Sequence, residues 1–347
     1  MTPINTALLS YGMSGEIFHA PLIAAHAGFR LSKIVQRKTA TAQRRYPSIQ
    51  VVNNIDDILQ DDSIELVVVN TPNETHYEYT VRVLEAGKHV VVEKPFSVTT
   101  AEADALIALA RKQNRVLTVF QNRRWDGDFL TLKQVVEQKF VGKIVEFELH
   151  YDRFRNYIEA NTWKEETAPG TGILYNLGSH MLDQVLVLFG LPHEVDARVG
   201  VQRPGGRVDD FYDIRLQYSG FHVIVKSSYL VRESMPRYIL HGTEGSFVKF
   251  GIDPQEQALK DGRLPGSAGW GQEQPSLWGS INTTIGGLHV TGTIETAQGN
   301  YLSFYNNVLE AIRNGATLAV RAEESREVIR LIEACAESNS RRAAVKL

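Results

Sequence analysis

Lys94 lies at a position where a side chain can act on a bound ligand. It follows the apolar run Val90–Val92 and Glu93 and precedes Pro95, a pattern typical of a buried parallel strand that ends in a charged pair. Ligands of open α/β sheets bind beyond the carboxyl ends of the strands. A partly desolvated lysine there can hold a hydroxyl oxygen or move a proton. Taken alone, a solvated Glu-Lys pair explains the same pattern.

A histidine in the second half of the chain is a candidate general acid or base. Asn176, His180 and Asp183 fall at i, i+4 and i+7 of an expected helix, so they share one stripe of its surface. A histidine oriented by polar neighbours suits acid-base catalysis, although a structural histidine that caps a turn is the alternative. The sequence has no Cys/His cluster with zinc spacing and no Gly-x-Ser-x-Gly elbow, so no metal is expected.

The first expected strand runs into a turn that suits a dinucleotide. The segment follows the pattern G-x-G-x-x-G, with serine at the first glycine position. Gly12 would let the backbone approach a pyrophosphate, and Gly15 would let helix and strand pack closely. A plain strand-to-helix turn is the alternative. The expected contacts are Ser10, Tyr11, Gly12, Met13, Ser14 and Gly15.

The segment after this turn favours NADP over NAD. An enzyme for NAD usually places an acidic residue about 20 residues beyond the glycines. No acidic residue occurs from Ile17 to Ile55. A 2′-phosphate needs cations, and Arg37, at the end of the second strand, could grip it in bidentate fashion. A solvated basic face is the alternative. The basic residues are Arg30, Lys33, Arg37, Lys38, Arg44 and Arg45.

A third polar segment follows the expected strand Leu66–Val69. Thr71 and Pro72 predict a turn along the cofactor cleft, with Asn73 next to them, and His76 begins the following helix. We interpret His76 as a helix cap or a cofactor contact. A solvent-exposed histidine is an equally good alternative.

The pattern of strands and helices predicts two domains. Short apolar strands alternate with amphipathic helices up to about residue 122, which indicates a doubly wound parallel sheet, the Rossmann arrangement. Thr99 and Glu102 form an expected capping box at the start of one helix. The expected strands are Ile4–Leu9, Phe29–Val35, Leu66–Val69, His89–Val92 and Val116–Phe120.

The remainder, residues 123–347, predicts an α+β domain with a large open, mainly antiparallel sheet. Long alternating segments occur with few helices between them. The glycine- and proline-rich segment Gly251–Gly299 predicts a long irregular excursion, and helices are expected at Tyr301–Asn314 and Ala322–Ser338. The expected strands are Ile144–Arg153, Val195–Val201, Tyr212–Tyr218 and His222–Leu230.

Composition narrows the functional class. The 347 residues are 43% hydrophobic and 22% charged, as in a soluble globular protein long enough for two domains. A net charge of -3 gives no general attraction to nucleic acid or membranes. We expect a cytoplasmic protein, because no signal peptide or spanning run is evident and one cysteine cannot form an internal disulfide. Cys335 falls on an apolar helical stripe and is expected to be buried.

Together these features resemble the Gfo/Idh/MocA family of sugar and cyclitol dehydrogenases over essentially the whole chain. The glycine turn, Thr71-Pro72, Glu93-Lys94-Pro95 and the helix at His180 carry this resemblance. Longer segments are similar to the branch of NADP-dependent scyllo-inositol 2-dehydrogenases. These segments are Gln121–Lys133, Asp152–Arg155, Tyr238–Gly242 and Val248–Glu256.

The resemblance implies hydride transfer between a polyol carbon and nicotinamide C4, with Lys94 orienting the reacting oxygen and His180 taking or returning its proton. It also implies a homodimer or homotetramer formed through the C-terminal sheet. Glu93 and Asn122 join the expected cofactor contacts. The expected substrate contacts are Lys94, Arg124, Trp125, Arg153, Trp163 and His180.

Asn176 departs from the family pattern, because relatives usually carry aspartate there. An amide can hold an imidazole by a hydrogen bond but cannot stabilise imidazolium as a carboxylate does, unless Asp183 takes over. Lys164 likewise follows Trp163 where close relatives have arginine. Two alternatives therefore stay open: a dehydrogenase of a linear or pyranose sugar, and a catalytically silent NADP-binding sensor.

Overall fold

The computed structural model describes residues 2–37, 40–160 and 162–347. The chain forms two compact units, and each is assembled from three separate stretches. The first comprises Met1–Trp125, Pro254–Trp270 and Asn300–Arg326. The second comprises Asp126–Asp253, Gly271–Gly299 and Glu327–Leu347.

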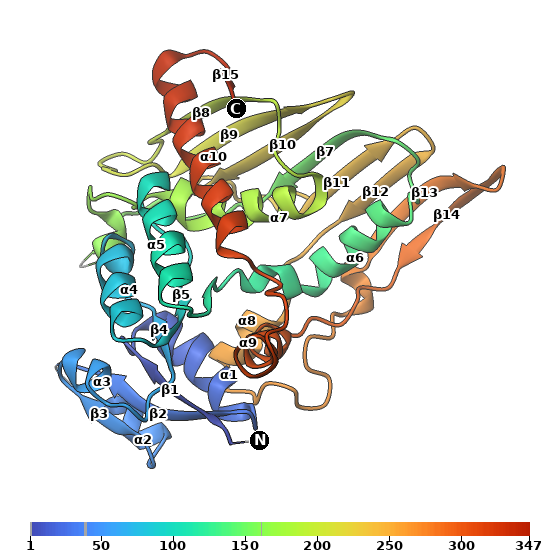
Figure 1. Ribbon diagram of the computed structural model, residues 1–347. Helices are drawn as coiled ribbons and strands as arrows, with labels where there is room; N and C mark the ends of the chain where they lie inside the picture. The colour runs from blue at the N-terminus through green and yellow to red at the C-terminus, as the bar shows by residue number, and fades with distance from the viewer. Residues whose placement is uncertain (1, 38–39, 161) are drawn as a thin grey trace. The chain divides into compact units, whose positions relative to one another are not determined.

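A six-stranded parallel sheet forms the centre of the first unit, in the order β3-β2-β1-β4-β5-β6 (Figure 1). The adjacent strands β4 and β5 are buried almost throughout, which explains the apolar sequences of Leu66–Val69 and Val90–Val92. The order reverses between β1 and β4, the switch point at which such sheets bind ligands. The strands are β1 (Ile4–Leu8), β2 (Phe29–Val35), β3 (Gln50–Val52), β4 (Leu66–Val69), β5 (His89–Val92) and β6 (Leu117–Val119).

Helices cover both faces of this sheet, because right-handed crossovers that run in opposite directions from the switch point place helices on opposite faces. The capping box predicted at Thr99 and Glu102 is confirmed at the start of α5. The helical segments are η1 (Ser14–His19), α1 (Ala20–Ala25), α2 (Thr41–Arg45), α3 (Asp56–Leu59), η2 (Asn73–Thr75), α4 (His76–Glu85), α5 (Thr100–Lys112), η3 (Asn122–Trp125), α8 (Gln255–Lys260) and α9 (Leu302–Asn314).

A nine-stranded sheet forms the second unit, in the order β14-β13-β12-β11-β7-β10-β9-β8-β15. All pairs are antiparallel except β7 with β10, which are parallel. The strands are β7 (Ile144–His150), β8 (Glu194–Gly200), β9 (Phe211–Tyr218), β10 (Phe221–Ser228), β11 (Tyr238–Gly242), β12 (Gly245–Lys249), β13 (Gly279–Ile285), β14 (Leu288–Ile294) and β15 (Val345–Lys346).

The helices α6 and α7 lie along one face of this sheet (Figure 1). Phe147 and Leu149 of β7 are fully buried, as is Val223 of β10. Glu146 and Glu148 alternate with the buried residues of β7 and therefore lie on the other face of the sheet. There they form ion pairs with His222 and Lys226. The helical segments are α6 (Gly127–Glu137), η4 (Trp163–Glu165), η5 (Leu174–Gly178), α7 (Ser179–Phe189) and η6 (Pro275–Leu277), and α10 (Ala322–Arg341) begins in the first unit and continues into the second.

The prediction of an irregular excursion at Gly251–Gly299 was wrong in its second half. There β13 and β14 form a hairpin across Gly286 and Gly287, whose φ angles of 58° and 82° suit glycine. The surrounding glycine, serine and threonine residues concealed the alternation of Ile281 and Thr283. Cys335 is fully buried, as predicted. Among the described residues, no helix combines the length and apolarity that crossing a bilayer would require.

Candidate functional site

The predicted glycine turn joins β1 to η1 and is tied to the end of β4. Asn70 Oδ1 accepts a hydrogen bond from Ser10 N at 3.0 Å, and Asn70 Nδ2 donates to Ser10 O at 2.9 Å. Ser10 Oγ in turn accepts from Gly12 N at 3.2 Å. The serine at the first glycine position therefore shapes the turn through its hydroxyl group.

The two glycines of the turn meet different surroundings. A Cβ on Gly15 would lie 2.4 Å from Ser10 O and 2.8 Å from Asn70 Nδ2, so this position requires glycine for the packing of the protein itself. A Cβ on Gly12 would meet only Ser10 Oγ, at 3.5 Å. The protein leaves space open beside Gly12, which fits the close approach of a pyrophosphate that this fold implies.

Arg37, the expected contact for a ribose phosphate, lies just beyond the end of β2. Arg37 is exposed and donates to Tyr79 Oη at 3.2 Å. Arg45 lies near the glycine turn: burial raises the pKa of Tyr11, Glu16 adds to this rise, and the charge of Arg45 opposes it.

Not all of the six basic residues expected to favour NADP lie at this edge of the sheet. Lys33 is committed elsewhere, because its Nζ lies 2.8 Å from Asp61 Oδ2 and donates to Asp57 O. Arg30 lies near the start of β2, at the opposite end from the site. Lys38 falls outside the described residues.

The prediction that His76 caps a helix or contacts the cofactor needs correction. His76 is fully buried and makes no side-chain cap. Its Nδ1 lies 2.7 Å from Pro95 O and its Nε2 3.0 Å from Thr71 O. Burial lowers the pKa of this imidazole against the opposing effect of the two carbonyls. His76 therefore holds two strand-end turns together, the one at Thr71-Pro72 with Asn73 and the one at Lys94-Pro95.

Lys94 follows β5 directly and is half-buried, with a cis peptide bond to Pro95. Its backbone N–H donates to Glu93 Oε2 at 3.0 Å. Glu93 is buried, and its Oε1 lies 3.0 Å from His19 Nε2. Burial opposes ionisation of this carboxyl, but His19, Lys94 and His76 outweigh that effect and lower the pKa of Glu93. Glu93 thus supports the Lys94 turn from within the protein, rather than facing outward as a cofactor contact.

The expected substrate contacts Arg124 and Trp125 lie in η3 and have partners within the first unit. Arg124 Nη1 donates to Ala319 O and to Glu324 Oε2, both at 2.8 Å. Trp125 packs edge to face against Phe304, with ring centroids 5.8 Å apart. These contacts give both residues a structural role, and Asn122 beside them is buried.

In the second unit, η5 and α7 carry the predicted acid-base residues. Asp209 Oδ2 accepts from Leu174 N at 2.8 Å and so fixes the start of η5. Asn176 lies in this π-helical segment, a geometry that is frequent at functional sites. His180 and Asp183 follow in α7 and are 6% and 2% exposed. The three residues of the predicted stripe lie on two consecutive helical segments, with Asn176 in η5 and the other two in α7.

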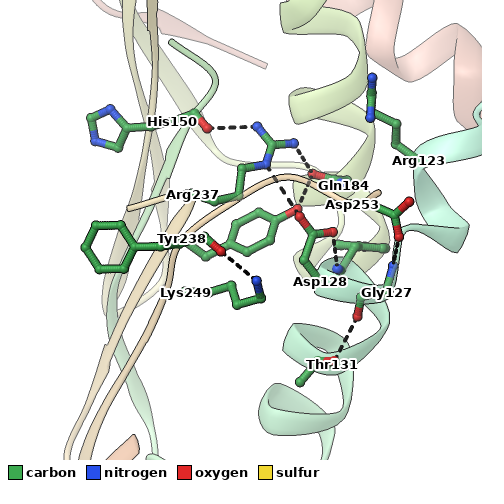
Figure 2. A network of polar contacts seen from close by, with 12 residues as sticks. Arg123, Gly127, Asp128, Thr131, His150, Gln184, Arg237, Tyr238, Lys249 and Asp253 are labelled. Atoms are coloured by element: carbon green, nitrogen blue, oxygen red, sulfur yellow. Dashed lines mark hydrogen bonds and ion pairs between the residues drawn. The ribbon is translucent and has the colours of Figure 1, made fainter. Parts of the chain in front are cut away.

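A buried polar network holds α7 one turn beyond His180 (Figure 2). Gln184 Oε1 accepts from Tyr238 Oη at 3.1 Å and from Arg237 Nη2 at 3.5 Å. Arg237 also donates to His150 O and lies 4.0 Å from Asp128 Oδ2. Because Gln184 is four residues after His180, this network fixes the rotation of the helical face that carries the histidine.

The other two expected substrate residues lie in less regular parts of the second unit. Arg153 follows β7 and places its guanidinium 5.5 Å from the Tyr151 ring. Trp163 lies in η4 and is 42% exposed. Arg203 holds this loop through Glu165 Oε2 at 2.8 Å and Tyr157 O at 2.7 Å.

Sequence reasoning missed the buried supports of the site: His19, Asn70, Tyr305 and Arg237. Asn70 follows β4 directly, so its place at the switch point was the available signal. The others have partners far away in the sequence. Among the described residues, no cluster of His, Cys, Asp or Glu could hold a metal ion.

The fold and the first unit's site define the chain as an oxidoreductase with an NAD(P)-binding Rossmann domain. Residues 4–121 match the family model "Oxidoreductase family, NAD-binding Rossmann fold" and residues 133–347 the model "Oxidoreductase family, C-terminal alpha/beta domain". The chain belongs to the Gfo/Idh/MocA family.

Individual relatives are similar over their full length. The chain is 40% identical to scyllo-inositol 2-dehydrogenase (NADP(+)) IolW of Bacillus subtilis, over 99% of this chain and 96% of that protein. It is also 40% identical to the oxidoreductase YdgJ of Escherichia coli, over 99% of both chains. The solved structure of the oxidoreductase yvaA from Bacillus subtilis matches with a TM-score of 0.97 and 40% identity, covering 100% of this chain and 99% of that one.

Proposed function

We propose that this protein is an NADP-dependent dehydrogenase that transfers hydride between a cyclitol or sugar-like polyol, of the scyllo-inositol type, and nicotinamide. The observation that carries this proposal is the position of Lys94. It directly follows β5, at the same edge of the parallel sheet as the glycine turn that follows β1. A cation is thereby presented where the substrate of a bound dinucleotide would lie. The name of the relative IolW supports the choice of polyol.

Three features support NADP as the cofactor. Arg37 is exposed at the end of β2, Arg45 lies near the glycine turn, and no acidic residue occurs between Ile17 and Ile55 to bind a ribose 2′-hydroxyl. A guanidinium matches the geometry of a phosphate group. Tyr79 supports Arg37 through its hydroxyl oxygen.

Bound nicotinamide supplies the hydride chemistry at its C4. In the oxidation of the polyol, Lys94 in its ammonium form would donate a hydrogen bond to the reacting oxygen. His180 would take the hydroxyl proton as the carbonyl forms, and in reduction it would return that proton. Thr71, Pro72 and Asn73 lie on the turn that His76 holds beside Pro95, so the backbone around Lys94 is fixed before any ligand binds.

Asn176 leaves the charged form of His180 without a carboxylate at that position. A carboxylate at that position would stabilise imidazolium, and the amide does not supply that charge. We propose that Asp183, buried on the same helix, takes this part. The alternative role of an NADP-binding sensor rests on Asn176 alone, and Lys94 speaks against it.

A substrate panel tests the proposal. Purified protein is assayed with scyllo-inositol, myo-inositol, linear polyols and pyranose aldoses, each with NADP and with NAD. We expect the fastest reduction of NADP with an inositol. Faster turnover of an aldose or a linear polyol would favour the alternative dehydrogenase, and binding of NADP without turnover of any compound would favour the sensor.

We further propose that the protein is a homodimer or homotetramer formed through the nine-stranded sheet. The face of that sheet opposite α6 and α7 carries acidic and basic residues from adjacent strands, as in the pair of Glu146 with His222. Light scattering after size exclusion measures the mass of the assembly. A monomer at micromolar concentration would contradict this proposal.

A further inference from the structure

Three polar side chains of the first unit form a buried chain that leads to Lys94. His19 ends η1, Glu93 follows β5, and Tyr305 belongs to α9. His19 Nδ1 lies 2.6 Å from Tyr305 Oη, and His19 Nε2 lies 3.0 Å from Glu93 Oε1. The side chain of His19 is 0% exposed and that of Glu93 is 11% exposed.

Aromatic rings surround this chain. The His19 ring packs against Phe120 with centroids 4.4 Å apart, and the Tyr305 ring contacts Phe29 at 5.5 Å and Phe304 at 5.3 Å. In such surroundings a carboxylate without donors is costly, so the contact with His19 is what allows Glu93 to stay ionised. If Glu93 were protonated instead, it would carry no charge and could not favour the ammonium form of Lys94.

The two oxygens of Glu93 have different partners. Oε1 faces His19, whereas Oε2 accepts the backbone N–H of Lys94 at 3.0 Å. Besides His19, this carboxyl interacts electrostatically with Lys94, His76 and Tyr305. A buried carboxylate beside a lysine favours the ammonium form of that lysine. Lys94 would then act as a charged hydrogen-bond donor and would leave proton removal to another group.

We infer that His19 is a positioning residue: by keeping Glu93 ionised and fixed, it maintains Lys94 as an oriented ammonium group, with Tyr305 holding the His19 ring. The effect on catalysis rests on the proposed function. The effect on the charge of Lys94 is independent of that function, because it concerns the protein without any substrate.

The first experiment therefore measures Lys94 directly. The protein is labelled briefly with acetic anhydride at a series of pH values, and the modified fraction of Lys94 is measured by peptide mass spectrometry. Only the free amine reacts. In Glu93→Gln, which keeps the shape but removes the charge, we expect Lys94 to react about tenfold faster at pH 7, because the loss of a close opposite charge shifts such equilibria by a unit or more. An unchanged labelling profile would overturn the inference.

Histidine variants decide the question if Glu93→Gln does not fold. His19→Leu removes the donor to Glu93, so the carboxyl becomes protonated and Lys94 should label faster. His19→Gln keeps an N–H donor and should retain the labelling of the wild-type protein. Wild-type labelling in both variants would contradict a role for His19. His89→Gln is the matched control, since His89 lies at the other end of β5, where its Nδ1 accepts from Val116 N at 3.0 Å, and its loss should not alter Lys94.

Turnover supplies the second readout. With a substrate found in the panel, His19→Leu should lower kcat at least tenfold at unchanged affinity for NADP, and His19→Gln should recover most of that loss. Altered labelling together with no turnover of any polyol by the wild-type protein would uphold the electrostatic inference while removing the proposed function. Unaltered labelling with normal turnover by His19→Leu would overturn the inference about His19 and leave the proposed function in place.

Discussion

Asn70 and Ser10 form a pair of hydrogen bonds across the ends of β4 and β1, in which the Asn70 amide both donates to and accepts from the Ser10 backbone. This pair stands directly against Gly15, whose Cβ position is occupied by Ser10 O and Asn70 Nδ2. The glycine turn is thus built by the protein on one side and left open at Gly12 on the other.

The two glycines should respond differently to alanine. Gly15→Ala forces a methyl group against backbone, so we expect a loss of about 1–3 kcal/mol in the free energy of unfolding. Gly12→Ala should fold with nearly unchanged stability but bind NADP at least about tenfold more weakly, because the methyl group occupies space intended for the pyrophosphate. Denaturant unfolding and fluorescence titration with NADPH measure the two effects. Normal NADPH affinity in Gly12→Ala would argue against this placement of the cofactor.

Arg37→Ala should discriminate between the two cofactors. We expect a loss of roughly 1.5–3 kcal/mol in binding of NADP, the worth of a charge-assisted contact with phosphate, and almost no change for NAD. Arg30→Ala is the matched control, because Arg30 is an exposed arginine near the start of the same strand. Isothermal titration with both cofactors gives the four dissociation constants needed. Equal weakening of both by Arg37→Ala would show that this side chain does not read the phosphate.

Lys94→Ala should separate binding from catalysis. We expect turnover to fall at least about a hundredfold, as for loss of a group that acts on the reacting oxygen, while NADP still binds to the folded protein. Steady-state kinetics with the best polyol and a parallel cofactor titration provide the test. Near-normal turnover would remove Lys94 from the mechanism and strengthen the sensor alternative.

Asn176→Asp tests the departure from the family pattern. A carboxylate near His180 favours imidazolium, so the rising limb of the rate-against-pH profile should move to higher pH. If the native geometry is kept, turnover above that limb should also rise, since the charged transition state is better stabilised. Turnover is measured against pH for both proteins, with His180→Ala beside them. An unchanged profile, with His180→Ala equally active, would show that a group other than His180 moves the proton.

His89 gives the stability of the first unit a dependence on pH. Burial, with help from Arg115, lowers the pKa of His89 to about 4, and protonation would remove the acceptor used by Val116 N. The folded pKa lies below the unfolded value of about 6.5, so this contribution is complete above that value and is lost as the pH falls toward 4. Between pH 7 and pH 4 the wild-type protein should lose about 1–2 kcal/mol more stability than His89→Gln, after allowance for partial exposure of the ring. Parallel losses in both proteins would show that His89 does not contribute.

The strands of the parallel sheet were predictable because their signal is local. Phe29–Val35, Leu66–Val69 and His89–Val92 were predicted with the bounds that the structure shows. The last two are short and almost wholly apolar, as is typical of buried parallel strands, whereas Phe29–Val35 also contains polar residues. The Rossmann sheet and the second, mainly antiparallel sheet were likewise confirmed. The parallel pairing of β7 with β10 left no such local signal, because it joins strands that are far apart in the chain.

The candidate site was predictable only where a motif carried it. Gly12, Gly15 and Lys94 follow patterns whose spacing has a physical reason, and the structure places all three at one edge of one sheet. His19 shows the opposite case: its partner Tyr305 is 286 residues away, and no periodicity within either segment indicates the contact. Side chains such as His76 and Arg124 had the right type for a ligand contact, but their use inside the protein depends on neighbours that only the folded chain supplies.

The discontinuous make-up of the first unit has a consequence for how the chain is made in the cell. The sheet β1 to β6 is synthesised first, yet α9, which packs Phe304 and Tyr305 against Phe120 and Phe29, leaves the ribosome only after β7 to β14 have been made. Until then the nascent sheet exposes an aromatic surface and the ring of His19 lacks a partner that it has in the finished protein. Such exposure makes partly made chains prone to aggregation and suited to chaperone binding. A stalled chain that ends before residue 300 would therefore be a much better chaperone client than a chain that includes α9.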